Sequence, residues 1–254
     1  MFKALLARAR QGYRTASYPA HDPSFPALFR GRPTLDPEKC VSGCTRCVDI
    51  CPADALTVSA SVPELDLGRC IFCSECEAAC PADAITFTQD WRLAASERTG
   101  LVVTGDREVR VDALRRELRR LLGRSLRLRQ ISAGGCNGCE AEMNALGNVV
   151  FDSSRFGIEF VASPRHADGI LVTGPVTRNM KRAALKTYEA VAEPKLVIAA
   201  GACAISGGIF RGHAEVCDGC DGIEDLFAVD LYVPGCPPHP YTVLDGLLRL
   251  LGRC

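Results

Sequence analysis

Two groups of cysteines near the start of the chain have a spacing that suits iron-sulfur chemistry. The first group reads Cys-x3-Cys-x2-Cys-x3-Cys-Pro and the second reads Cys-x2-Cys-x2-Cys-x3-Cys-Pro. In such runs three closely spaced thiolates bind one [4Fe-4S] cube, while the fourth, just before a proline, binds the other cube. We therefore expect two clusters with crossed ligand sets, namely Cys40, Cys44, Cys47 and Cys80 for one cluster and Cys70, Cys73, Cys76 and Cys51 for the other.

The two groups also form an internal repeat. Cys51-Pro-Ala-Asp-Ala-Leu56 returns 29 residues later as Cys80-Pro-Ala-Asp-Ala-Ile85, which is typical of two-cluster ferredoxins. One departure is the three-residue gap after Cys40, where the pattern has two residues, and we expect the extra residue to bulge at Gly43. Zinc sites normally use two separated CxxC pairs, so the third cysteine and the paired Cys-Pro ends favour iron-sulfur clusters over zinc.

The composition indicates a reducing compartment for these thiols. The chain has 254 residues, enough for two domains, and 15 cysteines. A disulfide framework is expected in small secreted domains, but the apolar run at the N-terminus is interrupted by Arg8 and Arg10 and does not resemble a signal peptide. No stretch approaches the roughly 18 apolar residues of a membrane span. We expect a cytosolic protein with metal-bound thiolates, no signal peptide and no transmembrane helix.

Charge is unevenly distributed although the formal net charge is zero. Residues 1–32 carry six Lys or Arg against one acid, residues 33–90 carry three against ten, and residues 107–129 carry nine against three. The basic residues 1–19 predict either a short amphipathic helix that docks at a membrane surface or membrane subunit, or a frayed terminus. The arginine run has no aromatic platform for bases, so we expect no nucleic-acid partner.

Residues 91–126 read as a linker that ends in an arginine-rich amphipathic helix, and an α/β pattern follows from residue 127. The leucine stripe of that helix consists of Val111, Leu114, Leu118, Leu121 and Leu122. Apolar runs then predict strands at Leu128–Ile131, Ile158–Val161, Ile170–Val172, Leu196–Ala199 and Leu231–Val233, with helices at 140–147, 178–191 and 239–251. Most of these strands end in glycine or proline, as expected of a parallel sheet whose carboxyl edge carries a site.

Four further cysteines follow these strands. Cys136 and Cys139 come after the first strand, Cys203 after the fourth and Cys236 after the fifth. Convergence of four thiolates would suit a third [4Fe-4S] cluster, although a CxxC pair alone also fits a redox pair or a zinc site.

Several segments resemble the small subunit of membrane-bound, energy-converting [NiFe]-hydrogenases of the formate-hydrogenlyase type, which is related to the cluster-N2 subunit of respiratory complex I. The segments are Gly134-Gly-Cys-Asn-Gly-Cys-Glu140, Ile170-Leu-Val-Thr-Gly-Pro175, Gly201-Ala-Cys-Ala204 and Val233-Pro-Gly-Cys-Pro-Pro238. Residues from Tyr18-Pro19 through the cysteine repeat resemble the two-cluster ferredoxin-like subunit of the same complexes. The two subunits, usually separate chains, are fused here.

The resemblance implies a fold, ligands and partners. It implies an α/β protein with an N-terminal two-cluster ferredoxin-like domain and a C-terminal flavodoxin-like domain, in which Cys136, Cys139, Cys203 and Cys236 bind a third [4Fe-4S] cluster. In the complex I relative the first two cysteines are adjacent, so their separation by Asn137 and Gly138 is the hydrogenase form. The implied partners are a [NiFe]-hydrogenase large subunit, membrane-anchor subunits, and an electron donor or acceptor such as formate dehydrogenase, carbon monoxide dehydrogenase or a ferredoxin.

We therefore expect an electron-transfer subunit of an oxidoreductase, without a complete active site of its own, attached peripherally to the cytoplasmic side of the cytoplasmic membrane. Its expected divisions are a basic helix and arm (1–32), the ferredoxin-like domain (33–90), the linker (91–126) and the hydrogenase small-subunit domain (127–254). The alternatives are a complex I-like component that delivers electrons to quinone, and a non-catalytic metal-binding assembly or sensor protein.

Two carboxylates and three cysteines remain. Glu140 and Glu142 lie at the start of a helix beside the third cluster set, where they either stabilise the helix N-terminus or relay protons. Cys217 and Cys220 form a CxxC pair without a second pair nearby, and Cys254 lies at the end of the chain. We expect these three to be plain thiols, since a zinc site needs four ligands.

Overall fold

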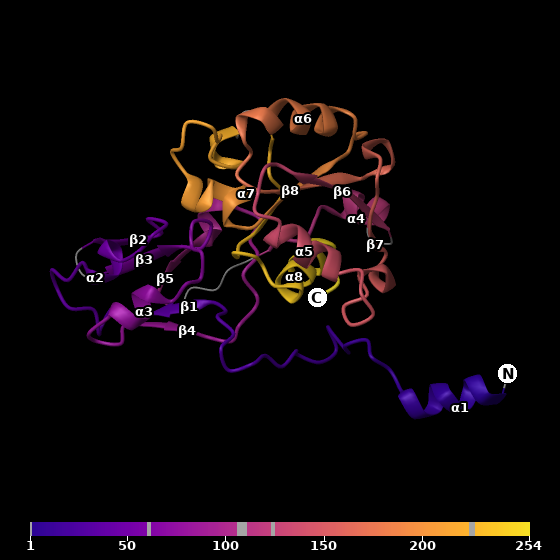
Figure 1. Ribbon diagram of the computed structural model, residues 1–254, viewed down its shortest axis with the longest axis horizontal. Helices are drawn as coiled ribbons and strands as arrows, with labels where there is room; N and C mark the ends of the chain where they lie inside the picture. The colour runs from indigo at the N-terminus through magenta and orange to yellow at the C-terminus, as the bar shows by residue number, and fades with distance from the viewer. Residues whose placement is uncertain (1, 60–61, 106–110, 123–124, 224–226) are drawn as a thin grey trace.

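The computed structural model describes residues 2–59, 62–105, 111–122, 125–223 and 227–254. It contains an N-terminal arm, a small cysteine-rich part with two antiparallel sheets, and a larger part built on a parallel sheet. Figure 1 shows the cysteine-rich part at one end of the molecule, beside the parallel sheet and its helices. The expectation of an α/β protein with a ferredoxin-like part and a parallel-sheet part is confirmed.

The cysteine-rich part follows the internal repeat. One antiparallel pair joins β1 (Pro33–Leu35) to β4 (Ile85–Phe87), and the other sheet has the order β2 (Leu56–Ser59), β3 (Val62–Asp66) and β5 (Val102–Thr104). The short helices α2 (Arg46–Asp49) and α3 (Glu75–Ala79) each carry one cysteine that faces inward and is buried. The strands that follow the two Cys-Pro turns are β2 and β4, and they belong to different sheets.

The larger part is a five-stranded parallel sheet in the order β10-β9-β8-β6-β7. Its strands are β6 (Leu126–Ser132), β7 (Ile158–Phe160), β8 (Gly169–Thr173), β9 (Leu196–Ala200) and β10 (Leu231–Val233). This is the flavodoxin-like order, in which the chain direction along the sheet reverses between β6 and β8. All five strands lie where the apolar runs predicted them.

Helices cover both faces of the parallel sheet. Successive residues of a strand point to opposite faces, and β8 shows this, because Leu171 packs in the core with α8 (Pro240–Leu250) while Ile170 and Val172 pack in the opposite core. The first core also includes Met143 of α5 (Gly138–Ala145), and the second includes residues of α6 (Arg178–Glu189) and α7 (Ala202–Ser206). Figure 1 shows α6 above the sheet and α5 with α8 below it.

The core that contains α6 and α7 continues into the cysteine-rich part. Leu65, Leu101 and Val103 from that part belong to the same cluster of buried side chains as Ile170 and Ile205. Residues 91–105 are therefore more than a linker. Trp91 and Leu93–Ala95 are buried, a 3-10 turn forms at Arg98–Leu101, and Val102–Thr104 forms strand β5. The two parts thus share one hydrophobic core.

The predicted arginine-rich helix forms only in part. α4 spans Arg116–Leu122, with Leu122 buried and Leu121 about two-thirds exposed at 65%. Val111 and Leu114 pack against the core although they precede the helix. Val111 and Leu114 at one end of the leucine stripe are therefore half-buried and Leu122 at the other end is buried, whereas Leu121 is exposed to solvent.

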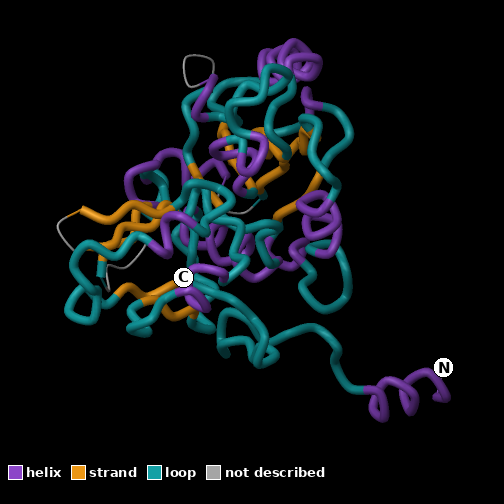
Figure 2. Tube along the Cα trace, turned by 60° about the vertical axis from the view of Figure 1, so that its left-hand side comes forward, coloured by secondary structure: helices purple, strands orange, loops and turns teal. Residues whose placement is uncertain are grey.

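The N-terminal arm leaves the body of the molecule and ends in helix α1 (Phe2–Gln11), as Figures 1 and 2 show. No residue of α1 is buried. The arm joins the body at Ala16, whose N–H donates to Val150 O at 2.9 Å, and Arg155 donates to the carbonyls of Ala16 and Tyr18 at 2.7 and 2.9 Å. Tyr18 Oη then donates to Asp245 Oδ1 of α8 at 2.7 Å. Among the described residues, no helix is both long and apolar enough to span a bilayer.

Candidate functional site

Four of the predicted ligands line one cavity in the cysteine-rich part. They are Cys40, Cys44, Cys47 and Cys80, and they share the cavity with mainly apolar neighbours such as Val41, Pro63 and Ile85. The space measures about 370 Å³ when its open mouth is included. We call it the outer cavity. Cys80, which follows α3, thus lies beside the three cysteines of the first group.

A second cavity contains the other predicted set. Cys51, Cys70, Cys73 and Cys76 line a space of about 300 Å³, again including its mouth, with Leu56, Leu65 and Phe87 among the other neighbours. Cys70 and Cys76 are only 7% and 6% exposed. We call this the inner cavity. The fold therefore exchanges the fourth cysteine between the two groups, as the spacing predicted.

The repeated Cys-Pro-Ala-Asp-Ala turns have the same local geometry. Asp54 and Asp83 have φ values of 47° and 48°, in the left-handed region that aspartate tolerates better than most residues. Each turn brings an alanine N–H back onto the sulfur that precedes the proline: Ala55 N lies 3.3 Å from Cys51 Sγ, and Ala84 N lies 3.3 Å from Cys80 Sγ. An N–H donor stabilises a thiolate and tunes a metal bound to it.

The extra residue after Cys40 is absorbed as the sequence predicted. Gly43 has φ of 77°, and a side chain there would meet nothing within 4 Å. The turn closes with Cys44 N donating to Val41 O at 3.1 Å. Cys40 consequently still reaches the outer cavity.

The third set of cysteines lies at the carboxyl edge of the parallel sheet. Cys136 follows β6, Cys139 lies in the first turn of α5, Cys203 lies in α7 just after β9, and Cys236 follows β10. Cys136 and Cys236 are exposed, whereas Cys139 and Cys203 are half-buried. We call this group the sheet-edge site.

The two half-buried thiols of the sheet-edge site interact electrostatically with the other thiols of the set. Burial, followed by the proximity of Cys203, Glu140, Cys236 and Cys136, raises the pKa of Cys139 to about 12. Burial, followed by the proximity of Cys236, Cys136 and Glu140, raises the pKa of Cys203 to about 11. Neighbouring thiolates repel each other. A bound cation relieves that repulsion and displaces the protons of the thiols.

Gly201 permits the close approach of one thiol. Its φ and ψ of 93° and 153° lie in a region that is essentially restricted to glycine. A Cβ at this position would lie 2.6 Å from Cys139 Sγ. Glycine is therefore required where β9 turns into α7 and passes beside that sulfur.

Two of the three sets suit iron-sulfur clusters. Each of them surrounds a cavity with four cysteines, and thiolates are the ligands that [4Fe-4S] clusters use.

Of the two predicted carboxylates, Glu140 has a clear structural role. Its Oε1 accepts hydrogen bonds from Ser132 Oγ and Thr173 Oγ1, both at 2.7 Å, so it ties α5 to the ends of β6 and β8. Burial raises the pKa of Glu140, but the two hydroxyl donors and a backbone N–H more than offset this, and its pKa lies below the usual value. Sequence reasoning missed Ser132 and Thr173, although a hydroxyl residue at the end of an apolar strand was a visible signal.

Glu140 also lines an open groove between β6 and α6. The groove measures about 960 Å³ including its open mouth, and Arg129, Ser132 and Met180 are among its other lining residues. Glu142, one residue beyond Ala141 on α5, is half-buried, and burial raises its pKa.

The three remaining cysteines line neither the outer nor the inner cavity. Cys220 is 2% exposed in the core with α7, and burial, helped by the Asp221 carboxylate, raises its pKa to about 12. Cys217 is half-buried and Cys254 is exposed. A buried thiol with a raised pKa is a poor nucleophile.

Comparison with known protein families shows two matches. Residues 136–250 match the family described as NADH ubiquinone oxidoreductase, 20 kDa subunit, and residues 39–85 match the 4Fe-4S dicluster domain. The segment 39–85 contains all eight cysteines of the outer and inner cavities, and the segment 136–250 contains the four cysteines of the sheet-edge site.

Three relatives show the range of similar proteins. Formate hydrogenlyase subunit 7 of Escherichia coli is 41% identical over 160 residues, which cover 63% of this chain and 62% of that protein. A probable membrane-bound hydrogenase subunit of Pyrococcus furiosus is 39% identical over 137 residues, 54% of this chain and 80% of that protein. An NADH-quinone oxidoreductase subunit of Citrifermentans bemidjiense is 48% identical over 112 residues, 44% of this chain and 64% of that protein. The chain thus spans less than two thirds of the first and third of these relatives.

Proposed function

This chain belongs to the family of membrane-bound hydrogenase subunits related to the 20 kDa subunit of NADH ubiquinone oxidoreductase, and from this premise we propose its function. It is the electron-transfer subunit of a membrane-associated [NiFe]-hydrogenase complex of the formate-hydrogenlyase type. It exchanges electrons with a nickel-iron site on a partner large subunit. Its other partners are membrane-anchor subunits and an upstream donor or acceptor such as formate dehydrogenase, carbon monoxide dehydrogenase or a ferredoxin.

The observation that carries the proposal is the grouping of twelve cysteines into three sets of four within one molecule. The outer cavity, the inner cavity and the sheet-edge site would each hold one [4Fe-4S] cluster. When bound, the clusters supply one-electron redox chemistry. The chain binds them through thiolates, donates N–H bonds to Cys51 and Cys80, and surrounds the inner cavity with apolar side chains that exclude water.

The hydrogenase assignment rests on the CxxC spacing of Cys136 and Cys139 and on the resemblance to the two hydrogenase relatives. The test is the iron and nickel content of the complex purified anaerobically from native membranes through a tag on this chain. We expect nickel together with about twelve irons per copy, from three cubes of four. Iron at that level without nickel would favour a quinone-linked complex instead. About eight irons would mean that the sheet-edge site holds no cluster.

We also propose that α1 attaches the complex to the cytoplasmic face of the membrane. Its Phe2 and Leu5 are 78% and 61% exposed, its charged residues Lys3, Arg8 and Arg10 are all basic, and it touches no other part of the described chain except through the arm. A free helix of ten residues is marginal in water, so a covering surface would stabilise it. Basic amphipathic helices bind anionic lipid surfaces.

Vesicle binding tests this attachment. The chain should bind vesicles that contain anionic phospholipid and should bind neutral vesicles more weakly, and replacement of Leu5 by Ser should weaken binding. Leu28→Ser is the matched control, because Leu28 is 88% exposed but lies outside the helix. Equal binding by both variants and by the unchanged chain would contradict the attachment through α1.

A proton-relay role is proposed for the carboxylates of α5. Glu142 supports it best, because its raised pKa brings it closer to proton exchange near neutral pH. Glu140 supports it by lining an open groove, although its hydroxyl donors favour the ionised form. Replacement of each by Gln should lower hydrogen turnover without changing the iron-sulfur spectra. Unchanged turnover in both variants would contradict a relay.

A further inference from the structure

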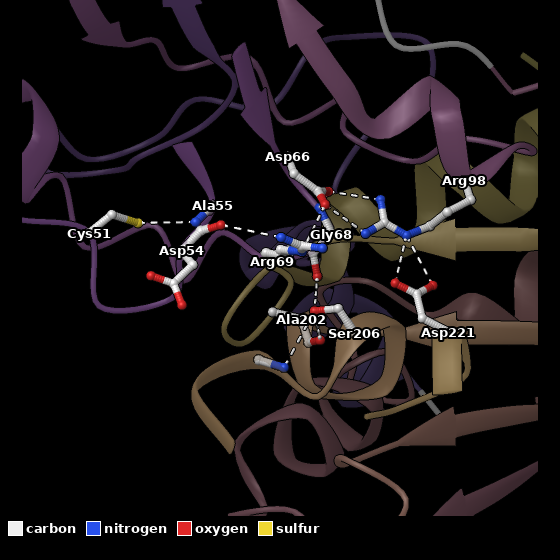
Figure 3. Close-up of polar contacts among 11 residues, drawn as sticks. Cys51, Asp54, Ala55, Asp66, Gly68, Arg69, Arg98, Ala202, Ser206 and Asp221 are labelled. Carbon is white, nitrogen blue, oxygen red and sulfur yellow. Dashed lines mark hydrogen bonds and ion pairs between the residues drawn. The ribbon is translucent and has the colours of Figure 1, made fainter. Parts of the chain in front are cut away.

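A group of polar contacts lies between the segment that carries the inner-cavity residue Cys70 and the segment that carries the sheet-edge residue Cys203. None of the side chains that make these contacts is a proposed cluster ligand. Figure 3 shows these contacts, which join the turn after β3 to α7 and to the 3-10 turn at Asp221–Ile223. Arg98 lies between them.

Arg98 forms a bidentate ion pair with Asp66. Its Nη1 lies 2.8 Å from Asp66 Oδ1 and its Nη2 lies 2.7 Å from Asp66 Oδ2. Asp66 also closes the turn that leads into the inner cavity, because its Oδ1 accepts from Gly68 N at 2.8 Å and its carbonyl accepts from Cys70 N at 3.0 Å. Arg98 therefore stabilises the turn that positions Cys70.

The same guanidinium holds the other part of the molecule. Arg98 Nε lies 3.0 Å from both carboxylate oxygens of Asp221. The neighbouring Cys220 N donates to Ala204 O of α7 at 2.7 Å, so the Asp221 segment is fixed against the helix that carries Cys203. The Arg98 and Asp66 side chains are 24% and 17% exposed, which shields their interaction from solvent more than at an open surface.

A hydroxyl provides a second bridge at the same place. Ser206, which is 1% exposed and lies at the end of α7, has its Oγ 2.9 Å from Gly68 O. Its alternative acceptor, Ala202 O, is farther away at 3.2 Å. Gly68 fits tightly, because a Cβ there would lie 2.9 Å from both Arg98 Cζ and Ile205 Cγ2.

We propose that Arg98 is a positioning residue that sets the separation between the inner cavity and the sheet-edge site, with Ser206 as its second support. Ser206 lies three residues from Cys203, and Arg98 reaches the same helix through Asp221 and the hydrogen bond from Cys220 N to Ala204 O. A shift of either segment therefore changes the gap between the two sites. Electron transfer between metal centres weakens steeply with their separation. Arg98 is required because its planar fork engages two carboxylates at once, which the single ammonium group of lysine does not reproduce.

The inference rests on the proposed binding of clusters at both sites, and one experiment does not need them. Hydrogen exchange of the segments 66–70 and 217–221 reports the bridge directly. We expect faster exchange of both segments in Arg98→Met, and unchanged exchange in Arg92→Met. Arg92 is the matched control. It lies in the same segment of the chain as Arg98 and forms an ion pair with Asp22 at 3.0 Å, but it does not join the two sites.

Magnetic interaction between reduced clusters measures the separation itself. In Arg98→Met combined with Ser206→Ala, we expect the iron content of the unchanged protein and loss of the splitting between the inner and sheet-edge signals. The splitting between outer and inner signals should remain, because both cavities lie on the same side of the bridge. Arg98→Lys should give an intermediate exchange rate and a weakened splitting.

Each outcome decides the proposal. Unchanged exchange and splitting in the double variant would overturn the positioning role, and so would loss of iron from the inner cavity, which would make Arg98 a determinant of cluster binding. If the unchanged protein itself holds fewer than about twelve irons, the proposed function fails, and the exchange experiment still tests the bridge. Ser206→Ala alone gives a milder variant that keeps both ion pairs if Arg98→Met does not fold.

Discussion

Replacement of Gly201 by Ala should remove the cluster of the sheet-edge site and leave the other two in place. The backbone conformation at Gly201 costs a residue with a side chain about 1–3 kcal/mol. The new Cβ would also lie 2.6 Å from Cys139 Sγ, and ordinary contact begins at 3.4 Å. Relief of the overlap therefore moves the sulfur by several tenths of an ångström, whereas metal–ligand distances tolerate a change of about 0.2 Å.

The assay is iron content of the anaerobically purified protein together with the spectrum of its reduced clusters. We expect about eight irons per chain in place of about twelve, with the signals of the outer and inner clusters retained. Gly212→Ala is the control, because Gly212 also has a positive φ, 76°, but a Cβ there meets nothing within 4 Å. A Gly201→Ala protein that keeps all its iron and all its signals would refute the reasoning from the Cys139 contact.

Three further variants test other parts of the structure. Tyr18→Phe deletes the hydrogen bond from the arm to the buried Asp245 carboxylate, and we expect a loss of about 1.5–3 kcal/mol in the free energy of unfolding, measured by chemical denaturation. Burial lowers the pKa of His239, so the unfolded chain takes up a proton at higher pH than the folded chain does. The stability that is present above about pH 6.5 should therefore decline below that pH, by up to about 1.4 kcal/mol per pH unit. His239→Asn, which keeps a side-chain acceptor for the N–H at the start of α8, should reduce that decline. The double variant Cys51→Ser with Cys70→Ser should keep about eight irons, because the inner cavity contains both cysteines.

Controls for these variants come from the same chain. Tyr13→Phe changes a tyrosine that is 82% exposed and should leave stability unaltered, and Cys254→Ser should cost no iron. A fall to about four irons in the double cysteine variant would indicate sequential ligand sets in place of crossed ones. An equal pH dependence in His239→Asn and the unchanged protein would show that other groups cause the decline.

The elements of the parallel sheet could be predicted from the sequence because each strand is a short apolar run that ends in glycine or proline. β8 shows the reason: all of its residues are buried, so its periodicity is replaced by a continuous apolar run. The crossed grouping of cysteines was predictable for a similar reason, since spacing alone fixes which thiols can reach one cube. The structure brings each predicted set together, and ligand binding at the sets stays a prediction.

Other features depend on contacts that local sequence does not encode. Arg98 and Asp221 are 123 residues apart, and nothing in either neighbourhood signals the other. Strand β5 was missed because three residues, Val102–Thr104, are too few to show a period, and their pairing with β3 is decided by the fold. Leu121 follows the helical spacing but finds no partner surface within the described chain, so it is exposed.

The shared core has a consequence for how the contact between the two parts responds to dilution. An interface between separate chains dissociates as concentration falls, and it usually needs more than about 1,000 Å² of buried surface to persist. Here residues 91–105 join the parts covalently and contribute Leu101 and Val103 to their common core. Formation of the contact between the two parts is therefore intramolecular, and the effective concentration of one part at the other is high. A bridge as small as one arginine and one serine can then define an alignment at any protein concentration, and the three cysteine sets are produced in a fixed ratio of one to one to one.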